Sequence, residues 1–345
     1  MTQEEKPIVL KRNDSIAFPV MLIPNARTQI AIQDKVEKNL LIKTWGGIGD
    51  QICSEPTLRM AVREFTKDGM TVSLASDQPQ LFAHLSFNKV FNLKEVTPKW
   101  ENYLVFDTIV SPDHLLWSFM SHCLTNCVDF PSICAFRMQL QVKDREIFMM
   151  PRKPHLNFPE KYILIHPGRH WPSKTFPKDW WDDVIKYLVE EGHTPIIIGA
   201  DADDNRGTVD INASNCWDLR NQTTIEETNW ICQHATVLLT NDSYPIHAAA
   251  SRNPNDETSG KTWIGYFATC KHPDYITHWR MNANKILEWN YRERNLGIGG
   301  MWNIINNCPN CEGEITVDKA DDFQVRSWLP YPETVVEWAV RKFYA

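Results

Sequence analysis

The sequence predicts an α/β protein, because three segments run from an apolar strand through a turn of small or polar residues into a helix. These segments are residues 39–65, 161–192 and 236–250. The chain has 345 residues, enough for two domains of typical size, and 43% of them are hydrophobic, as in ordinary globular proteins. Strands of an open α/β sheet present their carboxyl ends to the ligand crevice, so the turns at these ends form the candidate site.

The first turn is rich in glycine. A strand is predicted at 40–42. Behind it, Gly46, Gly47 and Gly49 let the backbone turn tightly and approach a ligand. The spacing differs from the dinucleotide-binding fingerprint GxGxxG, and such a turn alone is a weak signal. Its most informative residue is Asp50, a carboxylate at the mouth of the turn, ahead of an amphipathic helix predicted over residues 56–65.

The second turn carries cationic and hydroxyl side chains. The predicted strand 162–165 is broken by the sequence His-Pro-Gly, and the loop behind it holds Arg169, Ser173 and Lys174. At the carboxyl end of a strand such side chains can neutralise a diphosphate. Most basic loops are merely solvated, yet two turns suited to anions in one α/β half favour a binding crevice.

The third turn follows the short apolar strand 236–239. It passes through Asp242 and Ser243 into an alanine-rich helix that contains His247. Backbone N–H groups at a helix start attract anions, whereas Asp242 would repel a phosphate and accept hydrogen bonds from hydroxyls. This combination suits a sugar nucleotide better than a bare nucleotide. An ordinary cap on a buried helix explains this segment, taken alone, equally well.

The order of these segments resembles the heptosyltransferase family of glycosyltransferases. The resemblance rests on LLIKTWGGIGDQICSEPTLRMAV, ILIHPGRHWPSKTFPKDWWDDVIKYLVEEGHTPIIIGADADDN, the run 217–220 and LLTNDSYPIHAAA, and it covers most of residues 38 to about 275. It implies the GT-B architecture, with two Rossmann-like domains facing across a cleft. The donor nucleotide sugar would lie on the C-terminal domain and the acceptor on the N-terminal one, without a metal or other cofactor.

The resemblance also implies inverting glycosyl transfer. Asp50 matches the glycine-turn aspartate that is the family's proposed general base, with Gly47 and Gly49 beside it on the acceptor side. It would take the proton from an acceptor hydroxyl as that oxygen attacks the anomeric carbon. Lys174 and the helix start at Ser243 would stabilise the leaving nucleoside diphosphate.

The donor-binding residues implied by the resemblance lie in the second and third turns. They are Arg169, Ser173, Lys174, Asp242, Ser243, Tyr244 and His247. Ser173 and Lys174 match the loop that contacts the donor phosphates, Asp242 matches the carboxylate that binds the donor sugar, and the last three match the helix start around the diphosphate.

Two positions depart from the family pattern. Tyr244 stands where the family commonly has glycine, and Phe-Ala-Thr-Cys at 267–270 replaces the usual FGPT. We expect the Tyr244 ring to project toward the donor sugar or to cap the cleft. A ring that fills this space would favour a sugar smaller than a heptose, such as a pentose or a plain hexose.

The sequence leaves the acceptor open. The family default is a saccharide such as the lipopolysaccharide core. A hydroxymethylated base of bacteriophage DNA is an alternative, because residues 279–294 mix basic and aromatic side chains, although the net charge of −7 argues mildly against broad nucleic-acid binding. The third hypothesis is a non-catalytic nucleotide-sugar-binding protein, against which Asp50 and Lys174 argue.

Cysteine usage and hydropathy suggest a location. Nine cysteines are scattered along the chain, its first twelve residues hold no long apolar stretch, and no run approaches ~20 apolar residues. We therefore expect no signal peptide or membrane span, and a reducing cytoplasm of a bacterium or of a phage-infected host. Cys308 and Cys311 have the spacing of half a zinc site, but a second half is not evident, so a structural metal is not expected.

Proline punctuation and element signals suggest the domain organisation. The predicted parts are an N-terminal extension (1–37), an acceptor-side domain (38–152), a donor-binding domain (153–315) and a helical tail (316–345). Further strands are predicted at 71–74, 103–106, 194–198 and 262–267, and helices at 114–127, 180–192, from 224 onward, and 332–344. The last helix is expected to pack back on the first domain.

Overall fold

The computed structural model describes residues 38–108, 134–135, 138, 140–144, 146–169, 176–200, 207–241, 243–267 and 331–345. The chain divides into two compact units, Met1–Arg145 and Glu146–Ala345, and each is described by itself. The predicted N-terminal extension and the helix predicted at 114–127 lie outside the described residues.

The first unit contains a parallel sheet in the order β3-β2-β1-β4. Its strands are β1 (Asn39–Thr44), β2 (Thr71–Ser76), β3 (Val90–Asn92) and β4 (Leu104–Asp107). β1 pairs with both β2 and β4, so Thr44 lies opposite Ser76 and Lys43 lies opposite Asp107. The carboxyl ends of the central strands therefore meet at one edge of the sheet, where the glycine turn begins.

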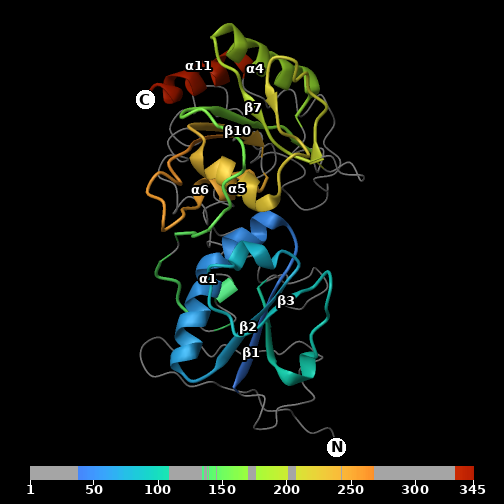
Figure 1. Ribbon diagram of the computed structural model, residues 1–345, viewed down its shortest axis with the longest axis vertical. Helices are drawn as coiled ribbons and strands as arrows, with labels where there is room; N and C mark the ends of the chain where they lie inside the picture. The colour runs from blue at the N-terminus through green and yellow to red at the C-terminus, as the bar shows by residue number, and fades with distance from the viewer. Residues whose placement is uncertain are drawn as a thin grey trace, which may run out of the picture. The chain divides into compact units, whose positions relative to one another are not determined.

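Helix α1 (Ile48–Lys67) packs along one face of this sheet (Figure 1). It begins eight residues before the start expected at Pro56, which lies inside the helix. A proline inside a helix removes a backbone hydrogen bond. Burial of the flanking Ile52 and Leu58 against the sheet compensates for that loss, and the sequence pattern does not show this packing.

The second unit contains a five-stranded parallel sheet and a short antiparallel pair. The sheet order is β11-β10-β5-β7-β9, and the pair joins β6 to β8. The strands are β5 (Ile163–His166), β6 (Gly168–Arg169), β7 (Ile196–Ile197), β8 (Gly207–Thr208), β9 (Trp217–Asp218), β10 (Val237–Asn241) and β11 (Trp263–Phe267). The predicted apolar runs are thus confirmed as strands, with the one at 194–198 shortened to two residues.

Helices cover both faces of this second sheet. They are α4 (Lys178–Glu190), α5 (Ile225–His234), α6 (Pro245–Ala250) and α11 (Pro332–Phe343). Figure 1 shows α4 and α11 together on one side of the sheet and α5 and α6 on the other. α5 starts with a capping box, in which the Thr224 hydroxyl accepts from the Glu227 N–H (3.3 Å) and the Glu227 carboxylate accepts from the Thr224 N–H (2.9 Å).

The C-terminal helix α11 packs on the second unit, so the expectation that it returns to the first domain is wrong. Val335 and Trp338 of α11 are fully buried in one core with Trp181 and Leu188 of α4. Lys342 also lies 3.9 Å over the ring of Trp263 in β11. The apolar stripe of α11 is matched by α4 and the sheet beneath it, and this complementary surface decides where the helix packs.

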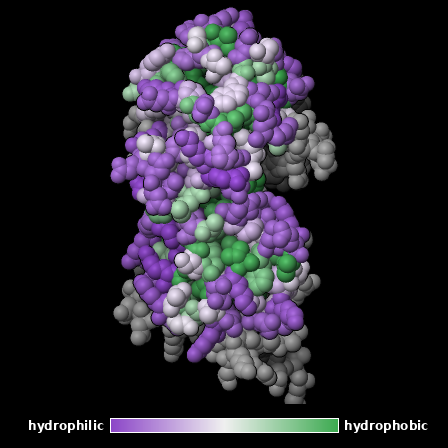
Figure 2. Space-filling model, in the orientation of Figure 1, coloured by the Kyte–Doolittle hydropathy of each residue, from purple (hydrophilic) through white to green (hydrophobic). Residues whose placement is uncertain are grey.

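Hydrophilic side chains dominate the surface seen in Figure 2, as in most water-exposed proteins. Within the described residues, no helix is both long and apolar enough to cross a bilayer.

Candidate functional site

The glycine turn of the first unit presents Asp50 to solvent. Gly46 has a φ of 97°, which side-chain-bearing residues rarely adopt, and Gly47 caps the start of α1. A Cβ atom on Gly47 would lie 2.9 Å from the Asp50 Oδ2, so the second glycine leaves room for this carboxylate. Asp50 is exposed and occupies the first turn of α1, where the helix dipole favours a negative charge.

Gln51, which sequence reasoning missed, anchors this turn from inside. Its side chain is fully buried and donates to the Gly46 carbonyl (3.2 Å) and to the Asp77 carboxylate (2.7 Å). It also accepts a hydrogen bond from the Ser76 hydroxyl (2.8 Å). The amide therefore joins the glycine turn to the end of β2. In the sequence Gln51 lies ahead of the helix predicted from Pro56, and a lone glutamine there gave no signal of this role.

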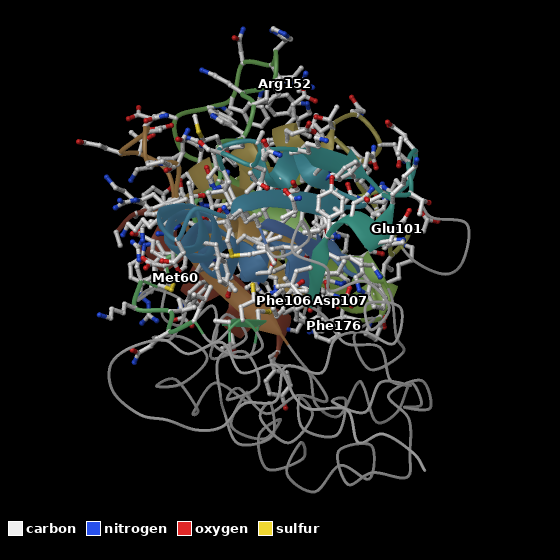
Figure 3. All side chains as sticks on the ribbon, turned by 90° about the horizontal axis from the view of Figure 1, so that it is seen from below. Met60, Glu101, Phe106, Asp107, Arg152 and Phe176 are labelled. Carbon is white, nitrogen blue, oxygen red and sulfur yellow. The ribbon has the colours of Figure 1, made fainter. Side chains whose placement is uncertain are left out.

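A lysine between aromatic rings lies at the same edge of the first sheet. The Lys43 Nζ is 3.5 Å from the Asp107 Oδ1, and it lies over the rings of Trp45 (5.3 Å) and Trp100 (5.8 Å). Asp107 follows Phe106 at the end of β4 (Figure 3). These contacts hold the Trp45 ring next to the glycine turn.

His166 organises the corresponding edge of the second unit. It ends β5, and its Nδ1 lies 3.2 Å from the Thr240 Oγ1 and 3.0 Å from the Ser243 Oγ. Thr240 also donates its hydroxyl proton to the Asn241 carbonyl at 3.1 Å. The His166 Nδ1 thus lies between the hydroxyls of Thr240 and Ser243 and links the end of β5 to the third turn.

Burial keeps His166 neutral. Removal from water lowers the pKa of the imidazole from 6.5 to about 4, and a hydrogen bond to its own backbone opposes this only in part. An uncharged imidazole at this edge orients hydroxyls without adding a positive charge. An anionic ligand here would accordingly depend on hydroxyl, backbone and lysine or arginine donors.

Asn241 ties the third turn to the second. Its side-chain oxygen accepts from the Gly168 N–H (3.1 Å), and its amide nitrogen donates to the Gly168 carbonyl (3.0 Å). A Cβ atom on Gly168 would come within 2.6 Å of that oxygen, so a glycine is required there. The two turns that the sequence singled out therefore begin side by side.

Tyr244 takes a different direction from the one expected. Its hydroxyl makes a hydrogen bond with the Thr228 side chain of α5, and its ring meets the His166 ring edge-on at 6.1 Å. Burial raises the pKa of the phenol above its ordinary range. The ring packs toward α5 because burying its carbons there also satisfies the hydroxyl, and a sequence motif does not reveal that partner.

The remaining predicted donor residues are only partly described. His247 is buried in α6, one turn from Ser243. The backbone of Arg169 forms β6, and Ser173, Lys174 and Asp242 lie outside the described residues. α6 has only six residues, so its dipole is weaker than that of a long helix.

The run 217–220 contains β9 and an ion pair between Asp218 and Arg220. The Arg220 guanidinium holds both Asp218 carboxylate oxygens, with the shortest contact at 2.6 Å, and these bonds lower the pKa of Asp218. In the parts of the chain that the structure describes, no group of three or more His, Cys, Asp or Glu side chains could hold a metal ion. Cys308, Cys311 and the basic, aromatic stretch 279–294 lie outside these parts.

The comparisons with known proteins agree with the resemblance drawn from the sequence. Residues 127–255, a little over a third of the chain, match the model of glycosyltransferase family 9 (heptosyltransferase). A stretch of 120 residues is 28% identical to lipopolysaccharide heptosyltransferase 2 of Salmonella typhimurium, covering 33% of this chain and 34% of that protein. The match thus spans about a third of the length of this curated relative. The resemblance to heptosyltransferases is confirmed.

Solved structures show the same fold. The iron-containing, dodecameric glycosyltransferase TibC of enterotoxigenic E. coli superposes with a TM-score of 0.55 at 13% identity, over 90% of this chain and 77% of that chain. A second TibC structure, in complex with ADP-D-beta-D-heptose, gives a TM-score of 0.50 at 12% identity, over 71% and 62% of the two chains. The predicted α/β fold class of the GT-B type is confirmed.

Proposed function

We propose that this protein is an inverting, metal-independent glycosyltransferase that moves a sugar from a nucleoside-diphosphate sugar to an acceptor hydroxyl. The observation that carries the proposal is the exposed Asp50 carboxylate at the glycine turn, in the place where the resembling family has its proposed base. The family match at 127–255 and the polar edge around His166 support a donor site in the second unit.

On this proposal Asp50 accepts the proton of an acceptor hydroxyl. The hydroxyl oxygen forms a bond to the anomeric carbon as the bond from that carbon to the diphosphate oxygen breaks. The diphosphate leaves with the electron pair, and attack from the opposite face inverts the anomeric centre. A single carboxylate suffices for the proton, because it needs only to reach the hydroxyl directly.

The donor residues hold the leaving group. The Ser243 hydroxyl, which lies 3.0 Å from the His166 Nδ1, would contact a phosphate oxygen. Lys174 and Arg169 would supply positive charge, and His247 lies one turn away on α6. Asp242 would accept hydrogen bonds from the sugar hydroxyls. These roles follow from the family resemblance and from the place of each residue in the sequence, in the second or third turn.

The sugar we propose to test first is a heptose. The Tyr244 hydroxyl is bonded to Thr228, so the sequence-based reason to expect a smaller sugar no longer holds. The curated relative is a heptosyltransferase, and TibC was crystallised with ADP-D-beta-D-heptose. The acceptor we propose is a saccharide such as the lipopolysaccharide core. The stretch that suggested modified DNA lies outside the described residues, and no observation of the structure favours that acceptor.

A donor panel tests the proposal. Purified protein is incubated with ADP-heptose, UDP-hexoses and UDP-pentoses, with and without saccharide acceptors, and products are followed by mass spectrometry. We expect acceptor-dependent release of nucleoside diphosphate that persists in a chelator such as EDTA. Binding of a donor without turnover would support the non-catalytic alternative. Activity that EDTA abolishes and added metal restores would contradict metal independence.

A further inference from the structure

Gln51 has every hydrogen-bonding group of its side chain in use. It is fully buried on α1, directly after Asp50. The Nε2 group donates to the Gly46 carbonyl at 3.2 Å and to the Asp77 Oδ1 at 2.7 Å, while the Oε1 accepts from the Ser76 hydroxyl at 2.8 Å. A glutamine side chain has two N–H donors and one carbonyl oxygen, so all are satisfied.

This pattern fixes the orientation of the amide. If the amide were reversed, its oxygen would face the Gly46 carbonyl and the Asp77 carboxylate, both of which are acceptors. Buried acceptors that face each other lose their hydrogen bonds and repel. The groups around the amide therefore require a donor on one side and an acceptor on the other. Among side chains of this length, only that of glutamine carries both on one uncharged group.

The contacts of Gln51 join two elements that carry the acceptor side of the site. Gly46 belongs to the turn between β1 and α1 and adopts the left-handed φ of 97°. Ser76 and Asp77 mark the end of β2, and Thr44 at the end of β1 pairs with Ser76. The backbone of Gln51 is tied to the same turn, because its N–H donates to the Gly47 carbonyl at 3.1 Å.

Asp50 lies between these anchored points. Its carboxylate is exposed and lies close to Gly47, where an added Cβ atom would be 2.9 Å from the Oδ2, so the turn and the first turn of α1 set where this carboxylate starts. A shift of the Gly46 carbonyl would rotate the first turn of α1 and carry Asp50 with it. Misplacing a reacting group by about 1 Å can lower a rate as much as 10²-fold.

We propose that Gln51 is a positioning residue, which sets the direction of the Asp50 carboxylate by tying the glycine turn to Asp77 and Ser76. The proposal rests on the proposed glycosyltransferase function, because it assigns Gln51 a role in that reaction. Asp77 serves as the anchor of the amide, and neither residue needs to touch a substrate.

A matched pair of variants tests the role of Gln51. Gln51→Leu removes the three side-chain hydrogen bonds, and Gln233→Leu serves as the control. Gln233 is also a fully buried helical glutamine, and it donates to the Ser251 hydroxyl (2.8 Å) in the second unit. We expect Gln51→Leu to lower kcat by about tenfold or more, with the Kd for nucleoside diphosphate changed less than twofold. Gln233→Leu should lower thermal stability similarly and leave kcat within about twofold.

Three further variants keep the test decisive if Gln51→Leu fails to fold. Asp77→Asn retains an oxygen that accepts from Gln51, whereas Asp77→Ala removes it, so only the second should lower kcat markedly. In Gln51→Glu the side chain can donate only when protonated. The ratio of its kcat to that of the wild type should therefore rise as the pH falls, when it is measured at pH values where circular dichroism shows both proteins fully folded.

The outcomes separate the positioning role from the function itself. Equal kcat for wild type and folded Gln51→Leu, or for Asp77→Ala and Asp77→Asn, would overturn the positioning role while leaving the transferase function intact. A wild-type protein that turns over no donor with any acceptor would overturn the proposed function, and the role of Gln51 with it.

Discussion

Asn241 and Gly168 bind each other through two hydrogen bonds, one in each direction, across 73 residues of sequence. The pair fastens the end of β10 to the first residue of β6, two residues beyond the end of β5, so the chain leaves these neighbouring strands at the same place. His166 adds a second link, through its contact with Ser243 at 3.0 Å. The proposed diphosphate site is thereby assembled on a rigid edge.

Gly168→Ala should disturb this edge. The added Cβ atom would lie 2.6 Å from the Asn241 Oδ1 and 2.7 Å from the His166 Cε1. We expect the free energy of unfolding to fall by about 1–3 kcal/mol, as in other overpacked sites, and the Kd for nucleoside diphosphate to rise several-fold. Urea denaturation and calorimetric titration measure the two effects. If the free energy of unfolding and the Kd were both unchanged, the residues around Gly168 would accommodate the added methyl group, and their packing would not order the donor site.

Lys174→Ala should weaken donor binding through lost charge. A hydrogen bond from a charged group to phosphate contributes about 1.5–3 kcal/mol, so the Kd for nucleoside diphosphate should rise roughly tenfold or more. Lys178→Ala is the matched control, because Lys178 lies four residues on and pairs with Asp182 on the exposed side of α4. Equal Kd values for the two variants would show that the loop around 174 is only a solvated basic loop.

His166 should make stability depend on pH. Its pKa is lowered from 6.5 to about 4 in the folded protein, so between these values the unfolded chain takes up a proton that the folded one does not. The contribution of His166 to stability is thus present above pH 6.5 and lost as the pH falls toward 4. The difference in pKa corresponds to about 3 kcal/mol.

The effect is isolated by replacing the imidazole. In His166→Gln the side chain cannot titrate, so the stability advantage of the wild type over this variant should shrink as the pH falls from 7 to 4.5. Urea denaturation at several pH values gives the difference. The exposed His155, replaced in the same way, serves as the control and should leave the pH dependence unchanged. A constant difference between wild type and His166→Gln would contradict the buried neutral imidazole.

Tyr244→Phe should lower stability without changing donor choice. The variant loses only the hydroxyl that bonds to Thr228, which contributes about 1 kcal/mol, and keeps the ring against His166. Tyr331→Phe, at a tyrosine with 76% of its surface exposed, is the control and should have no effect. A broadened donor preference at unchanged stability would instead indicate that the ring lines the sugar pocket, as the sequence had suggested.

The sequence predicted the sheets well because strand formation depends on local apolar runs. The stretches 40–42, 163–165 and 237–239 are buried on both faces in central parallel strands, and such strands contain little but branched apolar residues. The polar turns that end them were also visible, since small and charged residues directly after a buried run are conspicuous. This local chemistry placed the proposed site at the carboxyl ends of these strands, where the described turns begin.

What the sequence did not predict depends on partners distant along the chain. Gln51 gave no signal in the sequence, because its side-chain partners, Ser76 and Asp77, lie at the end of another strand. The direction of Tyr244 is decided by Thr228 on α5, and the packing of α11 is decided by the apolar face of α4. An apolar helix face or a bulky ring in the sequence indicates that the side chain needs a packing partner. Only the fold shows which element provides that partner.

Asp50→Asn tests the central claim most directly. The amide has the shape of the carboxylate but cannot accept a proton from the acceptor hydroxyl, so kcat should fall by roughly 10²-fold or more while the Kd for the donor is unchanged. Asp68→Asn, just beyond the other end of α1, is the control and should retain wild-type turnover. Steady-state turnover of the preferred donor and acceptor, compared among the three purified proteins, gives the answer. A kcat for Asp50→Asn within about twofold of the wild type would contradict the assignment of Asp50 as the general base.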